Sequence, residues 1–383
     1  MGKPRLAHLV LPFAPLVAGL AGFAGCTLLN PLDGYSGAAT EAGSDSPLPV
    51  VDAPTASSPP VEAGPPDAGC VVARPAQRPK ASTNPGSTTI VAALSSFTFG
   101  DAKDPSKPIA GGYDIDGLCT CPGPRACNPG NAAGVCDLAN GADNAFGEFW
   151  LIVESVLGAS GSVSSHVSMG DEGLLVRIKN YNDEPDDDLV EVGLFGTFGA
   201  EKRQDGGAGT LKRDGTDVWT VDAKSLLGGT PYLPVAVDNR AYVAGGIVIA
   251  EVKFPIRVGG VTFPLVQGYF TAKLVKKAGG YGFEGGILTG RFPAARFLTG
   301  LESIATGPAN YLCGTDPIYQ SVRDGVCRVR DLPTDPTTDG REGVCDAVSV
   351  TIGFDADPAV LGRVVTTPPP ARPCGGSWVA TCP

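Results

Sequence analysis

Short apolar stretches recur along the chain between residues 174 and 354, and they constrain its fold more than any other feature. Most have the length and residue types of strands, and Gly, Asn and Asp separate them. The stretches are Leu174–Ile178, Leu189–Phe195, Val218–Val221, Ala241–Val252, Val261–Leu265, Tyr269–Val275, Gly286–Thr289 and Val348–Phe354. The 53 glycines and 35 prolines among 383 residues exclude a helical bundle. The pattern is typical of an antiparallel sandwich or barrel, and we expect a mainly β fold, an antiparallel β-sandwich of jelly-roll or concanavalin-like type.

Three segments have helical rather than strand character, and we expect them at the edge of the sandwich. The first would begin at Asp143 as N-cap and bury Phe146, Phe149, Trp150, Val153 and Leu157. The second would open at Pro293 and place Leu298, Leu301 and Ala305 on one face. The third would span Ile318–Asp324, with Asp316 as N-cap, Pro317 in the first turn and Gly325 as the stop.

The N-terminus has the features of a bacterial export signal. Lys3 and Arg5 precede the apolar stretch Leu6–Phe23, and the stretch ends in Phe23-Ala-Gly-Cys26. This ending resembles the lipobox of bacterial lipoproteins, in which the cysteine is acylated, although Phe23 replaces the usual Leu. The alternative is an ordinary signal peptide with a chance cysteine. The resemblance implies lipidation of Cys26, and Thr27 rather than Asp after it implies an outer-membrane destination.

Composition divides the rest of the chain into a tether and one domain. Residues 36–66 are rich in Pro, Ala and Ser, with no aromatic or basic residue, so they cannot bury enough apolar surface to fold. No repeat and no second linker follows. We therefore predict a signal peptide with lipobox at 1–26, a disordered Pro/Ala/Ser-rich tether at 27–69 and a single exported β-rich domain at 70–383.

The domain contains an even number of cysteines once Cys26 is set apart. They are Cys70, Cys119, Cys121, Cys127, Cys136, Cys313, Cys327, Cys345, Cys374 and Cys382. Exported proteins meet an oxidising environment, so we expect all ten to form disulfides. A zinc site is the weaker alternative, because Cys119-Thr-Cys121 lacks the usual two-residue gap and no histidine lies nearby. Spacing alone leaves the connectivity open.

Several function classes are excluded by charge and histidine content. A net charge of −11 argues against a nucleic-acid partner. Loss of the signal peptide would leave His166 as the sole imidazole, in a polar loop or strand, so a HExxH zinc site is excluded. The motif Gly280-Tyr-Gly-Phe-Glu-Gly285 matches a dinucleotide fingerprint but lies between two strand-like stretches, so we interpret it as a hairpin.

Acidic residues on both sides of the cysteine-rich segment form a candidate calcium site. Asp114 and Asp116 precede this segment, and Asn140 and Asp143 follow it. Disulfides would hold these oxygen ligands still, and Ca²⁺ prefers such ligands. The alternative is that Asp114, Asp116 and Asn140 form turns and Asp143 only caps a helix.

A second acidic cluster supplies the candidate catalytic residues. Asp186, Asp188 and Glu191 resemble the E-x-D-x-x-E signature of retaining glycosidases on concanavalin-like sandwiches, with Asp in place of the first Glu. A solvated acidic turn is the alternative. An EF-hand is excluded, because Pro185 occupies the position that requires Gly. Tyr113, Tyr181 and Trp219 lie in turn-rich surroundings and are candidate sugar platforms.

The overall layout resembles uncharacterised cell-envelope lipoproteins of the myxobacterial type. The resemblance rests on Cys26-Thr-Leu-Leu-Asn, the Pro/Ala tether, and pieces such as Tyr113-Asp-Ile-Asp-Gly and Cys327-Arg-Val-Arg-Asp-Leu. It implies attachment to the membrane through the lipid. We expect the domain to bind a glycan, an envelope component or a protein partner without catalysis. An enzyme of the glycoside hydrolase type and a structural spacer without ligand are the alternatives.

Overall fold

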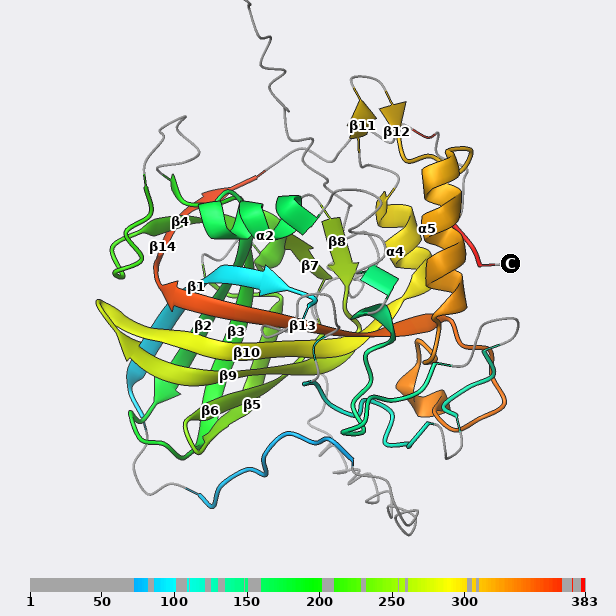
Figure 1. Ribbon diagram of the computed structural model, residues 1–383. Coiled ribbons are helices and arrows are strands. Elements are labelled where there is room, and N and C mark those ends of the chain that lie inside the picture. Colours follow the sequence, from blue (N-terminus) through cyan, green and yellow to red (C-terminus); the bar gives the residue numbers. More distant parts are fainter. Residues whose placement is uncertain are drawn as a thin grey trace, which may run out of the picture.

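Eight antiparallel strands close into a barrel in the computed structural model of the chain (Figure 1). Neighbouring barrel strands follow one another along the chain, so the barrel has up-and-down topology. Its strands are β1 (Thr88–Thr98), β2 (Gly173–Tyr181), β3 (Asp187–Thr197), β5 (Ala236–Ala244), β6 (Ile247–Val252), β9 (Gln267–Lys277), β10 (Gly280–Pro293) and β13 (Ala347–Pro358). The first strand therefore pairs with both β2 and the last barrel strand, β13.

The structure describes only part of the chain. The described residues are 72–81, 86–100, 109, 111–120, 125–129, 135–147, 149–150, 160–201, 210–228, 232–253, 255–258, 261–301, 305–307, 310–366, 374 and 380–382. The predicted signal peptide, the lipidation site Cys26 and the tether at 27–69 lie outside these residues.

The closed barrel corrects our expectation of a β-sandwich, although the mainly β composition is confirmed. Strands in a sandwich and in a barrel both alternate core and solvent positions, so the apolar pattern does not separate the two folds. The deciding contact is the pairing of β1 with β13, from Ala92 opposite Pro358 to Thr98 opposite Gly353. Irregular register in β1 and β10 bends these strands, which assists closure.

The apolar stretch Ala241–Val252 forms two strands rather than one. β5 and β6 make a hairpin in which Ala244 pairs with Ile247. Gly245 and Gly246 form its turn with φ angles of 60° and 80°, which side chains with a Cβ rarely adopt. The expected hairpin at Gly280 is confirmed, since β9 and β10 pair from Lys277 and Gly280 onward.

Short sheets and helices lie above the barrel and to its right in the view of Figure 1. The strands pair as β4 (Val218–Asp222) with β14 (Val360–Val365), β7 (Pro255–Val258) with β8 (Val261–Pro264), and β11 (Ala305–Gly307) with β12 (Asn310–Tyr311). The helices are α2 (Ser160–Met169), α4 (Ala294–Leu301) and α5 (Pro317–Arg328), with 3₁₀ turns η1 (Ala223–Ser225) and η2 (Pro336–Thr338). Side chains of β4 pack on the outside of β1, β2 and β3, so this face is covered.

The observed helices agree in part with those predicted from the sequence. Asp316 caps α5 as expected, because its carboxylate accepts a hydrogen bond from the Ile318 N–H at 2.7 Å. The helix does not stop at Gly325 but continues to Arg328. Glycine at position 325 allows the ring of Phe149 to pack closely, because a Cβ there would lie 2.2 Å from that ring. α4 ends at Leu301, so Ala305 lies in β11 instead.

The helix expected after Asp143 has a different cap. Residues 145–147 and 149–150 are helical, and the N–H of Gly147 donates to the side chain of Asn144 at 3.2 Å. Asp143 accepts instead from the backbone of Ile115. Asp143 is therefore not the cap, and the predicted helical residues Val153 and Leu157 lie outside the described part.

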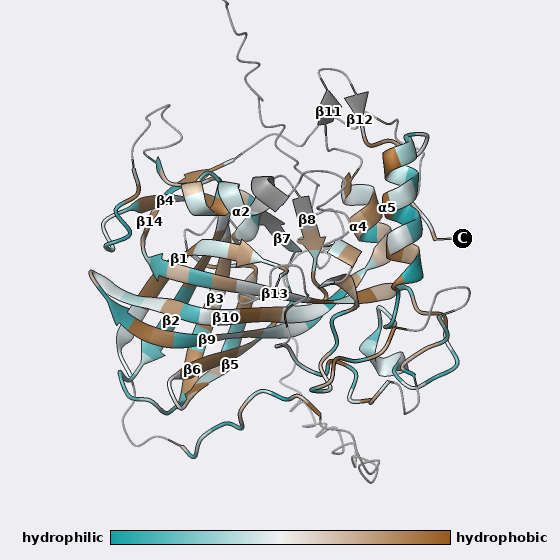
Figure 2. Cartoon of the chain, in the orientation of Figure 1, coloured by the Kyte–Doolittle hydropathy of each residue, from teal (hydrophilic) through white to brown (hydrophobic). Residues whose placement is uncertain are grey.

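One hydrophobic core fills the barrel and extends beyond one end of it. Figure 2 shows hydrophobic residues concentrated on the barrel strands, whereas the segment 72–81 below β5 is largely hydrophilic. Inside, the rings of Phe270 and Phe354 stack at 5.1 Å between centroids. At the end next to α4, Phe146 contacts Phe292 and Phe297 at 4.7 and 5.3 Å. These ring contacts join α4 and the helical turn at residues 145–147 to β10 of the barrel.

Disulfides connect distant parts of the chain, as the even cysteine count predicts. The described pairs are Cys127–Cys345, Cys313–Cys374 and Cys327–Cys382. Cys119 and Cys136 are also disulfide-bonded. Cys70 and Cys121 lie outside the described residues, so their pairing stays a prediction.

Candidate binding pocket and acidic cluster

A pocket of about 840 Å³ lies between the outside of the barrel and two loops. The segment around Arg74–Arg78 forms one wall, residues 114–117 form another, and strands β5, β6 and β9 form the base. Its charged and aromatic lining residues are Arg74, Arg78, Asp114, Asp116, Asp238, Arg240, Tyr242, Glu251 and Tyr269. The volume is in the range of small-molecule sites.

Strand alternation places the base residues on the outside of the barrel. The neighbours of Tyr242, Glu251 and Tyr269 along their strands belong to the core, so these three side chains point outward. The backbone N–H of Glu251 donates to Asp238 at 2.9 Å, which joins β6 to β5 at the pocket. The regular pleat of three adjacent strands thus gathers polar side chains on one surface.

The segment 72–81 is held against the outer surface of β5 by contacts with residues at the base of the pocket. The hydroxyl of Tyr242 donates to the carbonyl of Ala76 at 2.6 Å, and the Arg78 guanidinium lies 4.5 Å from the centre of the Tyr242 ring. Arg78 also donates to the carbonyls of Asp188 and Arg240. These interactions fix the wall of the pocket on the barrel.

The tyrosines of the pocket remain neutral hydrogen-bonding groups. Burial raises the pKa of Tyr269, and the nearby Glu251 carboxylate raises it further. Burial also raises the pKa of Tyr242. The pocket therefore combines neutral hydroxyls with carboxylates and guanidinium groups.

The three aspartates among the expected calcium ligands lie together at the edge of this pocket. Asp114, Asp116 and Asp143 each offer a carboxylate oxygen, and these oxygens all lie within 4.8 Å of one another. Asn140 is exposed, in the turn where the Gly141 N–H donates to the Leu138 carbonyl at 2.7 Å. Asp137 is an additional neighbour that sequence reasoning did not single out, and its carboxyl interacts with Asp143. Asp137 directly follows Cys136, so the signal was present in the same acidic run.

Backbone N–H groups orient the carboxylates of this acidic cluster. Asp114 accepts from Gly117 at 2.6 Å, and Asp116 accepts from Leu118 at 2.7 Å. Asp143 accepts from Ile115, also at 2.7 Å. These bonds are of the kind that turns make with aspartate, but they tie residues from both ends of the cysteine-rich segment into one unit.

Burial and mutual repulsion disfavour ionisation of the acidic cluster. Burial raises the pKa of Asp116 to about 8, and the charges of Asp114 and Asp137 contribute. Burial raises the pKa of Asp143 well above its usual value, with repulsion from Asp116. Burial also raises the pKa values of Asp114 and Asp137. The cluster therefore needs protons or a cation to offset the repulsion.

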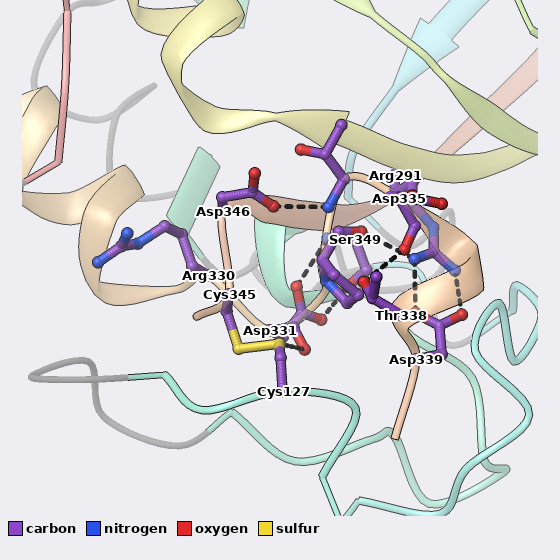
Figure 3. The surroundings of a disulfide bond; sticks show 12 residues. Cys127, Arg291, Arg330, Asp331, Asp335, Thr338, Asp339, Cys345, Asp346 and Ser349 are labelled. Carbon is purple, nitrogen blue, oxygen red and sulfur yellow. Dashed lines mark hydrogen bonds and ion pairs between the residues drawn. A yellow bond between two sulfur atoms is a disulfide. The ribbon is translucent and has the colours of Figure 1, made fainter. Parts of the chain in front are cut away.

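A buried guanidinium that contacts the loop at residue 115, that of Arg291, is paired with another carboxylate, Asp339 (Figure 3). Arg291 is fully buried and donates to both oxygens of Asp339, at 2.8 and 2.9 Å. It also donates to the carbonyls of Pro333 and Ile115, at 2.8 and 3.3 Å. These bonds attach the loop at residue 115 to β10, while the charge of Arg291 is matched by Asp339.

Around the Cys127–Cys345 disulfide, further hydrogen bonds hold the loop before β13 (Figure 3). Asp331 accepts from the N–H and the hydroxyl of Ser349, at 2.8 and 2.5 Å. Burial raises the pKa of Asp331 to about 7. The acidic cluster thus lies on a surface fixed by a disulfide, a buried ion pair and backbone bonds.

The candidate catalytic residues lie at the start of β3 and interact with other groups. Asp186 is exposed and accepts from the Gly245 N–H at 2.8 Å. Glu191 forms ion pairs with Arg177 and Lys179, at 3.1 and 2.8 Å. Despite its partial burial, these partners lower the pKa of Glu191. The general acid of a retaining glycosidase needs a raised pKa, and the partners of Glu191 act in the opposite direction.

Other residues singled out in the sequence occupy unexpected positions. Trp219 and Tyr181 are buried, so they cannot present a ring to a sugar. Tyr113 is half-buried and contacts the ring of Tyr269 edge-on at 5.8 Å. His166 lies in α2 rather than in a loop or strand, and its Nδ1 is 3.7 Å from Asp171.

Comparison of the chain with protein-family models, with curated proteins and with solved structures found no match. Among the described residues, no helix is both long enough and apolar enough to cross a membrane.

Proposed function

We propose that the chain is a lipid-anchored protein of the bacterial cell envelope whose barrel domain binds a saccharide without catalysing a reaction. The pocket above β5, β6 and β9 carries this proposal. Its volume of about 840 Å³ accommodates an oligosaccharide segment, and its presence favours binding over a purely structural spacer.

The residue types of the pocket suit a polyhydroxylated ligand. Sugar rings offer apolar C–H faces and edges of hydroxyl groups, which pair with aromatic and planar polar side chains. Tyr269 supplies an aromatic surface, Glu251 and Asp238 supply acceptors, and Arg240 supplies donors. Mixed charges favour a neutral or zwitterionic saccharide over a strongly charged polymer.

Glu251→Gln tests saccharide binding. Glu251 is exposed, so the substitution preserves the fold while removing a charged acceptor. Because a hydrogen bond to a charged group contributes about 1.5–3 kcal/mol, we expect the affinity for a glycan selected on an array to fall at least about tenfold. Glu284→Gln, the same change at an exposed position of β10, is the control and should bind normally. Absence of glycan binding, or equal affinity of both variants and wild type, would contradict the proposal.

The envelope location rests on the N-terminal sequence and on the disulfides. Charged residues, an apolar stretch and Phe23-Ala-Gly-Cys26 form the export and lipidation pattern. Disulfide bonds such as Cys127–Cys345 support an oxidising compartment. The lipid would attach the domain to the outer membrane through the tether at 27–69.

Cys26→Ser tests the anchor. Without the thiol no acyl chain is added, and each buried methylene of such a chain contributes about 0.8 kcal/mol to membrane binding. We expect the variant to move from the detergent phase to the aqueous phase in phase partitioning, while its disulfides still form. If membrane association is unchanged, lipidation of Cys26 is not the anchor.

A further inference from the structure

A buried carboxylate oxygen in the acidic cluster has no hydrogen-bond partner. Asp114 is only 7% exposed, and its Oδ2 is buried without a partner, while Oδ1 accepts from Gly117. An unpaired buried oxygen of this kind is costly unless a ligand satisfies it. Asp114 is also one of three residues, with Asp116 and Asp143, that each place a carboxylate oxygen within 4.8 Å of the others.

We propose that Asp114, Asp116 and Asp143 bind one calcium ion at the edge of the saccharide pocket. Ca²⁺ contacts oxygens at about 2.3–2.6 Å, so two ligands on opposite sides of the ion lie about 5 Å apart. Three oxygens within 4.8 Å of one another can therefore surround one ion without rearrangement of the backbone.

The donor set selects calcium among common metal ions. The cluster offers carboxylate oxygens and no imidazole or thiolate, so zinc and copper are disfavoured. Magnesium usually retains several waters and takes only one or two carboxylates, whereas this cluster offers three buried or half-buried carboxylates. Calcium accepts this number of oxygen ligands and tolerates irregular geometry.

The surrounding structure positions the ligands before an ion binds. One oxygen of each carboxylate accepts from a backbone N–H, of Gly117, Leu118 or Ile115. The carbonyl of Ile115 accepts from buried Arg291, which fixes this loop on β10. A rigid site loses less conformational entropy on binding, so the affinity is higher than that of a flexible acidic turn.

Calcium binding by the purified full-length protein, in the absence of any saccharide, tests this inference. We expect equilibrium dialysis with Ca²⁺ to show one ion per chain, and Tm to rise with calcium concentration relative to chelator. Asp116→Asn keeps the acceptor for the Leu118 N–H and the side-chain shape. We expect this variant to bind calcium at least about tenfold more weakly. Substitution of residues that only hydrogen-bond to metal ligands already lowers metal affinity by about that factor.

Asp186→Asn is the matched control. It makes the same chemical change in an exposed acidic turn and keeps an acceptor for Gly245. We expect its calcium affinity to equal that of wild type. Absence of binding by the folded wild-type protein at millimolar calcium, or equal affinity of Asp116→Asn and wild type, would overturn the inference. Because no glycan is used, this result is separate from the outcome for Glu251→Gln.

Discussion

Individual charged residues on the barrel are stabilised by specific partners. Asp357, at the end of β13, accepts from Lys277 and Arg213, both at 2.9 Å. Partial burial opposes its ionisation, but these two hydrogen bonds and positive charges prevail and lower the pKa of Asp357. These two ion pairs join β9 and the loop at residue 213 to β13, so they contribute to the stability of this end of the barrel.

The pH dependence of stability should report this lowered pKa. A carboxylate whose pKa is lower in the folded state stabilises the fold above the unfolded pKa of about 3.9, and this contribution disappears as pH falls through the folded pKa. We expect Asp357→Asn to reduce the free energy of unfolding by about 1 kcal/mol at pH 6. In urea unfolding, the difference from wild type should shrink toward zero as the pH falls below the unfolded pKa of about 3.9 and through the lower folded pKa. A difference that is constant with pH would show that the charge is not responsible.

At the scale of elements, local patterns predict strands well but do not predict their partners. Apolar stretches such as Leu174–Ile178 and Val348–Phe354 lie within strands, and Asp316 caps α5. Pairing of β1 with β13 joins residues near position 90 to residues near 355, and no local pattern encodes such a contact. The sandwich was therefore a reasonable expectation from alternation, and it was wrong because closure is a long-range property.

The two candidate sites also differ in how far the sequence alone predicts them. Asp114, Asp116 and Asp143 could be predicted as neighbours, because they flank a cysteine-rich segment that disulfides were expected to close. The pocket could not be predicted, since Tyr242, Glu251 and similar residues are ordinary outward positions on separate strands. Only the register of β5, β6 and β9 brings them under the segment 72–81.

At the scale of the whole molecule, disulfides restrain the covering loops on the barrel. Cys127 and Cys345 are 218 residues apart in sequence, so their bond attaches the cysteine-rich segment to the region before β13. A small hydrophobic cluster that includes Ile115, Ala126 and Leu332 lies around this bond. Cys313–Cys374 and Cys327–Cys382 instead hold the C-terminal region near α5.

Joint replacement of Cys127 and Cys345 by Ala should therefore loosen one part of the molecule selectively. Loss of a native disulfide of this span typically costs about 2–5 kcal/mol, and we expect a loss of this size in chelator, where calcium cannot contribute. Limited proteolysis should cut first between residues 111 and 147, while the barrel strands stay protected, because this segment loses its only described covalent link to β13. Joint replacement of Cys313 and Cys374 is the control and should leave that segment as resistant as in wild type. Equal protease resistance of the segment in both double variants would mean that Arg291, Asp339 and the small hydrophobic cluster suffice to hold it.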